Sequence, residues 1–338
     1  MEELVDILIV TYNTNEKFLR KQIDSILRQT YKNLKIYISD NRSIDKNVEK
    51  VLKEYEEKDE RIKLFIQPLN YEYKKNVEFL LKKSKAKYIM FAEDDDIWYK
   101  NKVEKCLKKL KEDEVDLVYC NCRQIDEEGI VLQDDYFKYK NIALINKNNK
   151  LVISRGISKG CSLMITRQVR NKMLPFKKYV IAHDWLAACI ANEGNGISYI
   201  KEPLFDYRLN IVDRWKKEEC IEVKEGRRRR RRRVKKIDEY EVYLKQRKEI
   251  IEKQYLKAIA MCRQYCKKEE NKTYIANAKI YYGNILETKK VNWNIKEYFN
   301  ILYIKNNLKI TIKEIILFHF PIIGYAQFCI ANSRKSNN

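Results

Sequence analysis

Four consecutive acidic residues follow an apolar stretch in the first third of the chain. Residues 88–92 have the length and composition of a buried strand, and Glu93, Asp94, Asp95 and Asp96 come directly after it. Adjacent carboxylates repel one another, so either a cation or several hydrogen-bond donors neutralise them, or they form a solvated loop that caps the next helix. Because their ligand atoms are all oxygens, the cation they favour is Mg²⁺ or Mn²⁺.

Two other polar segments also follow predicted strands. Thr11 and its neighbours come after the apolar run 5–10, and Asp40 comes after the alternating run 34–38. Thr11 and Asp40 offer donors and acceptors suited to the edge of a nucleotide base. An Asp after a strand is also a common turn former, so Asp40 alone does not establish such a site.

The elements that must position these residues alternate between strand and helix. Helical spacing begins at Glu16 and recurs over 48–55 and 76–81, and a further strand is predicted over 62–67. This alternation predicts right-handed crossovers and a parallel sheet covered by helices on both faces. In such sheets the ligand binds at the carboxyl edge, where the three polar segments would meet. No glycine-rich loop follows the first strand, so the sequence supports neither a Rossmann dinucleotide site nor a P-loop, and a nucleotide would be held by side chains.

The middle of the chain continues this pattern. A helix is predicted over 103–110, a strand over 117–119, and a small-residue loop over 156–162 that runs into another strand. His183 and Asp184 then open an apolar helix, where an Asp is most often an N-terminal cap.

Composition separates the chain into two parts. The formal net charge is +22, and most of the excess follows Asn210, with Arg227–Arg233 as seven consecutive arginines. Three interpretations of this run remain open: a solvated segment without a partner, binding to an anionic membrane surface, or binding to nucleic acid, the least favoured. The apolar segment 315–325 is too short to span a bilayer and either lies at the interface or packs as a core helix.

Cysteine usage and the N-terminus bear on location. The nine cysteines have no metal-ligand spacing with the two histidines, His183 and His319, so we expect reduced, mostly buried thiols. The start of the chain lacks the features of a secretory signal, and no apolar run reaches transmembrane length. We therefore expect a cytoplasmic protein, peripheral at the inner face of the cell membrane.

Four phrases together resemble a known family. The segments 9–13, 22–34, 38–45 and 91–98 are similar, in order and spacing, to the nucleotide-binding half of family 2 glycosyltransferases of the GT-A fold, and the similarity extends over roughly residues 5–210. The His183-Asp184-Trp185 phrase and the strands that end in Tyr207 and Arg208 resemble rhamnosyltransferase-like members. This chain differs from the usual pattern at Glu93, at Asn41-Arg42 and at Asn210.

The resemblance implies roles for individual residues. It implies that the nucleotide-sugar is bound by Thr11, Tyr12, Asn13, Asp40, Glu93 and Asp94. The family's metal ligand corresponds to Asp95, and Asp184 corresponds to the general base of an inverting transfer. Asp96, His183 and Trp185 are expected to contact the acceptor or to support the site.

The combined prediction is an α/β protein: a GT-A, mostly parallel sheet with helices on both faces over residues 1–215, and a basic helical region over 216–338. The predicted activity is inverting, Mn²⁺- or Mg²⁺-dependent transfer of a sugar, with rhamnose as one candidate, from a dTDP- or UDP-sugar. The acceptor would be a lipid-linked saccharide of a surface glycan. The alternative is a catalytically degenerate scaffold that binds membrane or nucleic acid through its arginine run.

Overall fold

The computed structural model describes residues 2–140, 142, 144–147, 152, 157, 159–177, 180–209, 257–269, 272 and 275. The chain divides into two compact units, one of residues 1–152 and 156–216 and one of residues 153–155 and 217–338. The arginine run, Asn210 and the apolar segment 315–325 lie outside the described residues. In the second unit the structure describes α11 (Lys257–Arg263) and a few residues after it.

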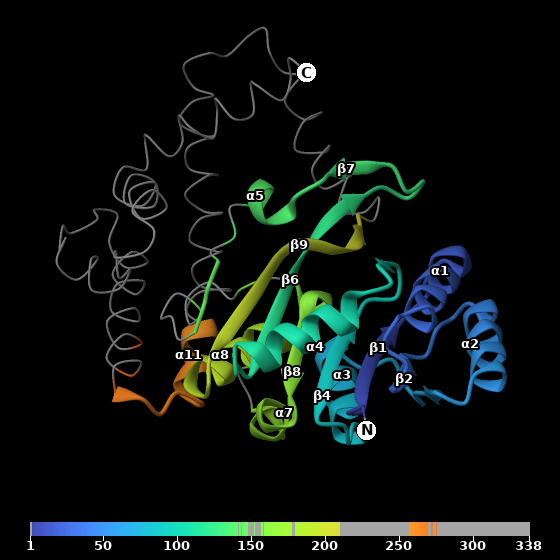
Figure 1. The fold of residues 1–338 in the computed structure, drawn as a ribbon. Helices are drawn as coiled ribbons and strands as arrows, with labels where there is room; N and C mark the ends of the chain where they lie inside the picture. The colour runs from blue at the N-terminus through green and yellow to red at the C-terminus, as the bar shows by residue number, and fades with distance from the viewer. Residues whose placement is uncertain are drawn as a thin grey trace, which may run out of the picture. The chain divides into compact units, whose positions relative to one another are not determined.

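The first unit is built on one nine-stranded sheet (Figure 1). Its strands are β1 (Val5–Thr11), β2 (Leu34–Asp40), β3 (Ile62–Ile66), β4 (Tyr88–Ala92), β5 (Ile97–Trp98), β6 (Leu117–Ile125), β7 (Val131–Gln133), β8 (Leu163–Thr166) and β9 (Ile197–Arg208). The spatial order is β3-β2-β1-β4-β8-β6-β9-β5, with β7 paired to β6. β1 and β4 are buried along their whole length, as their apolar sequences predict.

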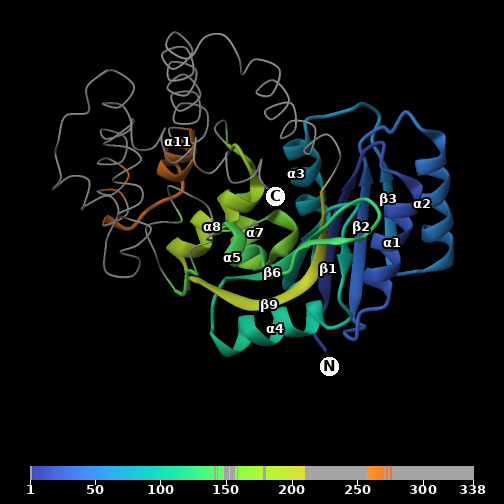
Figure 2. The same ribbon diagram turned by 90° about the horizontal axis from the view of Figure 1, so that it is seen from above.

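Helices cover both faces of this sheet (Figure 2). They are α1 (Glu16–Leu27), α2 (Lys46–Lys58), α3 (Tyr73–Lys83), α4 (Lys102–Glu112), α5 (Tyr136–Lys140), α7 (Arg167–Met173) and α8 (His183–Glu193), with a short 3₁₀ turn η1 (Gly160–Ser162). α1 and α4 lie on one face, and α3, α7 and α8 lie on the other. The helices and strands predicted before residue 210 are confirmed; the strand predicted over 117–119 is longer and extends to Ile125, and the helical region predicted over 216–338 lies mostly outside the described residues.

The sheet is parallel over the strands β3, β2, β1 and β4 and again between β6 and β9. β3, β2, β1 and β4 pair in parallel, as the alternation predicts. β8 then runs antiparallel to both β4 and β6, and β5 runs antiparallel to β9. These pairings agree with the prediction of a mostly parallel sheet, and β8 is antiparallel because it joins the sheet from a loop rather than through a helical crossover. The closing segment is one long strand, β9, and not several.

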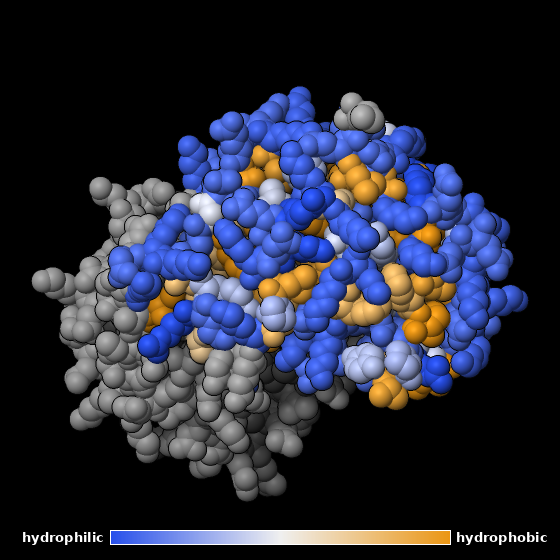
Figure 3. Space-filling model, turned by 90° about the horizontal axis from the view of Figure 1, so that it is seen from below, coloured by the Kyte–Doolittle hydropathy of each residue, from blue (hydrophilic) through white to orange (hydrophobic). Residues whose placement is uncertain are grey.

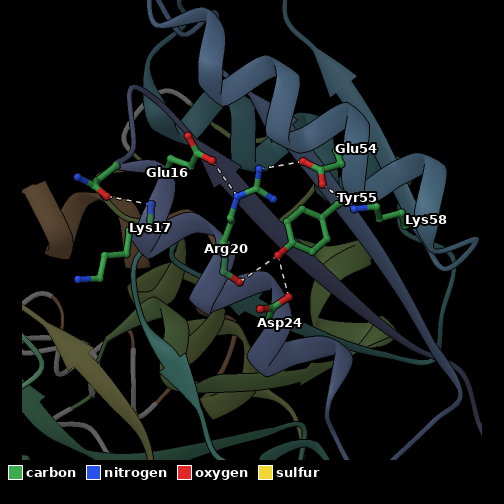
Figure 4. A network of polar contacts seen from close by, with 8 residues as sticks. Glu16, Lys17, Arg20, Asp24, Glu54, Tyr55 and Lys58 are labelled. Atoms are coloured by element: carbon green, nitrogen blue, oxygen red, sulfur yellow. Dashed lines mark hydrogen bonds and ion pairs between the residues drawn. The ribbon is translucent and has the colours of Figure 1, made fainter.

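Polar side chains fix where α1 begins and how it packs against α2. The Asn15 side chain caps α1 by accepting a hydrogen bond from the Lys17 amide at 2.9 Å. Figure 4 shows how α1 joins α2: Arg20 bonds to Glu54 at 2.8 Å, and the Tyr55 hydroxyl donates to Asp24 at 2.7 Å. These contacts fix α1 beside α2 and leave the loop between β1 and α1 at the carboxyl edge.

Two further expectations are answered by the described residues. Seven cysteines are described, and all are unbonded to each other and buried, as predicted. No helix within the described ranges has the length and apolar composition needed to cross a membrane.

Candidate active site at the carboxyl edge of the sheet

Thr11 and Asp40 meet at the ends of two neighbouring parallel strands. They are register partners on β1 and β2, and the Thr11 hydroxyl donates to Asp40 Oδ1 at 3.0 Å. The Ser43 amide donates to Asp40 Oδ2 at 2.9 Å, and the Ser43 hydroxyl also donates to Oδ1, at 2.5 Å. Asp40 is buried, and the three donors hold its side chain in a fixed orientation.

The loops that follow these strands are joined to each other. The Asn13 amide donates to Ser43 Oγ at 2.9 Å, and Asn13 Oδ1 accepts from the Ile44 amide at 2.7 Å. Asn13 and Arg42 both take the left-handed backbone conformation, with φ of 50° and 64°. Arg42 thus adopts a conformation that favours glycine, and the interloop hydrogen bonds offset the cost of this conformation.

Asp94 links the acidic segment to the first loop. Its Oδ2 accepts from the Tyr12 amide at 3.3 Å and from the Thr14 hydroxyl. The predicted nucleotide-binding residues of β1, β2 and the acidic segment are therefore neighbours in space. The Tyr12 side chain is exposed (42%) and has room to contact a ligand.

Asp95 and Asp96 are held by the end of β9. Arg208 donates from Nε to the Asp95 backbone oxygen at 2.9 Å, and its own amide donates to Asp96 Oδ1 at 3.2 Å. The guanidinium also bonds through Nη1 to the backbone oxygens of Asp126 and Glu127 and lies 4.2 Å from the ring centre of Phe18. A buried arginine thus fixes the turn that carries the acids.

Lys102 is a second buried cation near Asp96. The Lys102 side chain is fully buried, donates to the Cys161 backbone oxygen at 2.7 Å, and lies 3.7 and 3.9 Å from the ring centres of Trp98 and Phe205. Asp96 is also fully buried, and within the described part of the chain its Oδ2 has no hydrogen-bond partner. The charge of Lys102 therefore partly compensates a buried carboxylate.

The acids resist ionisation. Burial and the charges of Asp96, Asp94, Asp95 and Asp184 raise the pKa of Glu93 to about 8. Burial and neighbouring acids likewise raise the pKa of Asp95 to about 8, against the opposing charge of Arg208. Burial raises the pKa of Asp96 to about 6, because Lys102 and hydrogen bonds from the Cys161 thiol and the Arg208 amide offset part of the effect. This clustered negative charge is what a bound cation would neutralise.

The residues present fit a divalent cation that is shared with a ligand. No three His, Cys, Asp or Glu side chains of the described ranges form a complete ligand set. The Asp95 carboxylate, however, accepts no hydrogen bond from any other residue that the structure describes, while burial and then the neighbouring charges raise its pKa. Mg²⁺ and Mn²⁺ sites that use one or two carboxylates together with substrate phosphates have this composition. Asp95 is therefore the residue that would hold the ion.

His183 and Asp184 begin α8 beside the acidic segment. The charge of Asp184 contributes to the raised pKa of Glu93, which places the two carboxylates in one electrostatic environment. Asp184 Oδ1 accepts from the Trp185 amide at 2.7 Å. Oδ2 has no hydrogen-bond partner among the residues that are described, so one oxygen is available to take a proton. Asp184 lies in the first turn of α8 but does not cap it, because the N-cap residue is Ala182.

His183 and Trp185 differ in what they can contact. The His183 ring is buried against Phe91 and Tyr73, with ring centres 4.7 and 5.8 Å apart, and burial lowers its pKa. Its Nε2 has no partner within the described part of the chain. The Trp185 indole already donates to the Val152 backbone oxygen at 2.8 Å. His183 is therefore a packing residue with one unused polar atom, and Trp185 contributes ring surface rather than a donor.

Four residues of this site were not singled out from the sequence as site residues. Thr14 and Ser43 bind the carboxylates, and Arg208 and Lys102 are the buried cations. Short hydroxyl side chains after a strand are a signal for the first two. No local sequence pattern marks Lys102 and Arg208 as site residues. Each reaches the acidic segment only in the folded protein, Lys102 from α4 and Arg208 from the end of β9.

The two cavities that the structure outlines lie elsewhere. One, of about 240 Å³, is lined by Asn121, Asp135 and Lys201 among others. The other, of about 600 Å³, is at the amino-terminal edge, lined by Lys111, Asp116 and Arg167 among others. Figure 3 shows the molecule from that side, with hydrophilic residues around several separate apolar patches. None of the predicted site residues lines either cavity.

Comparisons with known proteins agree with this geometry. Residues 6–170 match the sequence profile of glycosyl transferase family 2. The chain is 28% identical over 226 residues to an uncharacterized glycosyltransferase of Methanocaldococcus jannaschii, which covers 64% of this chain and 75% of that protein. It is 34% identical over 132 residues to WfgD of Escherichia coli, UDP-Glc:alpha-D-GlcNAc-diphosphoundecaprenol beta-1,3-glucosyltransferase, covering 38% of this chain and 49% of that enzyme. The chain spans between 26% and 75% of the length of the first curated relatives it matches.

The fold has a counterpart among solved structures. The mannosyltransferase PcManGT of Pyrobaculum calidifontis, solved with GDP-Man and Mn²⁺, superposes with a TM-score of 0.53 at 14% identity, covering 88% of this chain and 71% of that one. At this identity the likeness establishes the fold alone. The α/β prediction with a GT-A sheet is confirmed.

Proposed function

We propose that this glycosyltransferase, whose residues 6–170 match the sequence profile of glycosyl transferase family 2, transfers a sugar from a nucleoside diphosphate donor with inversion at the anomeric carbon. The observation that carries the proposal is the convergence of Asp40, the acidic segment and Asp184 at one sheet edge. Relatives whose names specify a UDP-sugar or GDP-Man support this class of donor.

The base of the donor binds at Thr11 and Asp40, and the ribose and diphosphate extend toward Asp94 and Asp95. Asp40 is oriented by three hydrogen bonds, so its carboxylate is preorganised to accept from a base N–H. A Mn²⁺ or Mg²⁺ ion held by Asp95, when bound, neutralises charge on the diphosphate. The ion in PcManGT supports this assignment.

Asp184 acts as the general base. Its free carboxylate oxygen removes the proton of the acceptor hydroxyl as that oxygen forms a bond to the anomeric carbon, and the bond from that carbon to the diphosphate breaks. Attack opposite the leaving group inverts the configuration. The proton ends on Asp184, and the electron pair leaves with the nucleoside diphosphate.

The acceptor is a saccharide of a surface glycan, linked to a lipid through phosphate. The name of WfgD, which specifies a diphosphoundecaprenol-linked acceptor, supports this class. Such an acceptor lies at a membrane, and Arg227–Arg233 supply the charge for peripheral binding to anionic lipid. Replacing these arginines by glutamine should abolish sedimentation with vesicles of phosphatidylglycerol; unchanged sedimentation would contradict the membrane role.

A donor screen with matched variants tests the proposal. Purified protein with Mn²⁺ is assayed for release of nucleoside diphosphate from dTDP-rhamnose, UDP-glucose, UDP-GlcNAc and GDP-mannose. We expect turnover of one dTDP- or UDP-sugar and a loss of at least about a hundredfold in D95N and D184N. E202Q, which removes a surface carboxylate that pairs with Lys105, is the control and should retain full activity. Full activity in both aspartate variants would refute the mechanism.

A further inference from the structure

Lys159 is a cation next to Tyr207, the residue that precedes Arg208 on β9. Its Nζ lies 3.2 Å from the Tyr207 hydroxyl, 4.4 Å from the centre of the Tyr207 ring and 6.0 Å from that of Tyr136. No carboxylate of the described residues pairs with it. The Ser162 amide and hydroxyl donate to the Lys159 backbone oxygen, at 3.0 and 2.6 Å, and fix the loop that carries it.

Both members of the pair are adjacent to residues that contact the acidic segment. Tyr207 precedes Arg208, which bonds to Asp95 and Asp96. Lys159 is two residues before Cys161, whose backbone oxygen accepts from Lys102. Negative charges on Cys161, Asp96, Glu93 and Asp95 add to the effect of burial in raising the pKa of Tyr207, which agrees with this placement.

Lys159 and Tyr207 lie on the opposite side of β4 from the residues proposed to bind the nucleotide base, Thr11 and Asp40. In the strand order, β2 and β1 carry Asp40 and Thr11 on one side of β4; β9, which carries Tyr207, and β8, which follows the loop of Lys159 and the turn η1, lie on the other. The general base Asp184 is on α8, which packs against β6 and β9 on that same side. The half of the site that contains Lys159 is therefore the half from which an acceptor hydroxyl would be deprotonated.

An anionic acceptor needs a cation on this side. The carboxyl groups of the acidic segment and of Asp184 offer no positive charge to an approaching anion, and the side chains of Lys102 and Arg208 are buried and bonded to backbone oxygens. Lys159 uses one of its three N–H groups on Tyr207, and the Tyr207 hydroxyl keeps its own hydrogen to donate. Together they present donors that match the oxygens of a phosphate group.

We infer that Lys159 and Tyr207 form a subsite that binds a phosphate of the acceptor. This inference rests on the proposed function. It adds to that function the two residues that recognise the phosphate of the acceptor, and it implies that an alkyl glycoside is a poorer acceptor.

The test compares two acceptors and one nucleotide. The probes are GlcNAc-diphospho-phenylundecyl lipid, the matching undecyl α-GlcNAc glycoside, and UDP with Mn²⁺. The variants are K159Q, K159R and Y207F, and K108Q, at a largely exposed lysine of α4, is the matched loss of one charge. Binding is measured by isothermal titration and transfer by steady-state kinetics, and melting temperatures verify that each variant is folded.

We expect K159Q to weaken binding of the diphosphate acceptor about ten- to a hundredfold and to raise its KM, with kcat nearly unchanged. K159R should restore most of the affinity, and Y207F should lose less. Binding of the alkyl glycoside and of UDP should remain within twofold, as should all values for K108Q.

Three results for K159Q would overturn the inference. Weaker UDP binding with unchanged binding of both acceptors would assign the phosphate to the donor. Equally weakened binding of both acceptors, or no change in any affinity, would also contradict it. Absence of transfer by the wild-type protein with every donor would refute the proposed function instead. In that case the titration measurements still test the role of Lys159, because binding of the acceptors requires no turnover.

Discussion

Arg208 donates from its Nε to the backbone oxygen of Asp95 at 2.9 Å, so the last residue of β9 holds the turn that follows β4. The side chain is buried, with 2% exposed, and its Nη1 bonds to two further backbone oxygens, of Asp126 and Glu127. One guanidinium thus ties three segments together next to the proposed metal ligand.

R208K should lower both stability and metal affinity. Lysine keeps the charge but lacks the planar fork, so backbone oxygens that are now bonded lose their donors. We expect the free energy of unfolding to fall by about 2–4 kcal/mol in urea titrations and the Kd for Mn²⁺ to rise. R123K, which alters a partly exposed ion pair with Asp206, is the control and should leave Mn²⁺ binding unchanged. Wild-type Mn²⁺ affinity in R208K would contradict this role.

T11V and D40N should weaken nucleotide binding. Thr11→Val removes one of three donors to Asp40, and we expect a three- to tenfold rise in the Kd for the nucleotide of the identified donor, from the roughly 0.5–1.5 kcal/mol of one hydrogen bond. Asp40→Asn should cost more, because the acceptor itself is lost. Titration calorimetry with UDP or dTDP measures both. D45N, at the N-cap of α2, is the control. Unchanged affinity in D40N would remove Asp40 from the base site.

G160A should displace the His183 ring. A Cβ built on Gly160 would lie 2.6 Å from His183 Nε2 and 2.8 Å from Cε1, closer than atoms pack. The resulting overpacking costs about 1–3 kcal/mol and moves the residue beside the general base, so kcat should fall as well. The double variant G160A/H183A should recover stability relative to G160A. A single variant as stable as the wild type would show that the imidazole has room to move.

His183 should make stability fall in mild acid. Burial lowers its pKa below the ordinary value, against a smaller opposing effect of Asp184. The unfolded chain therefore takes up a proton near pH 6.5 while the folded chain resists it, so this contribution is present above that pH and is lost as the pH falls through the folded pKa.

Urea titrations at pH 7.5 and 5.5 measure this contribution as the difference between wild type and H183Q. The acids with raised pKa act in the opposite direction, because their contribution is lost as the pH rises, but they are common to both proteins and cancel. A pH dependence of equal size in the two proteins would contradict the assignment to His183.

The sequence predicted what depends on local pattern. The apolar runs before Thr11, Asp40 and Glu93 identified the strands, and parallel pairing then required their polar ends to share an edge. The position of β8 was not predictable in this way, since its antiparallel pairing with β4 follows from a tertiary arrangement rather than from periodicity.

The same distinction applies within the site. Asp94 was recognised by its neighbours in sequence, whereas its partner Thr14 lies 80 residues away. Lys102 offsets part of the charge of Asp96, and Arg208 bonds to the backbone oxygen of Asp95. Both contacts depend on elements that only the complete sheet brings together. Roles assigned to Asp95 and Asp184 remain predictions that the variants above test.

β9 is the last strand of the described sheet along the chain, and this has a consequence for synthesis. The family profile ends at residue 170, yet Asp184, the proposed base, and the strand that carries Arg208 to the acidic turn come later. A nascent chain released from the ribosome before residue 197 carries the acids without the arginine that secures them. The order of synthesis therefore leaves the acidic turn without its hydrogen bond from Arg208 until β9 joins the sheet.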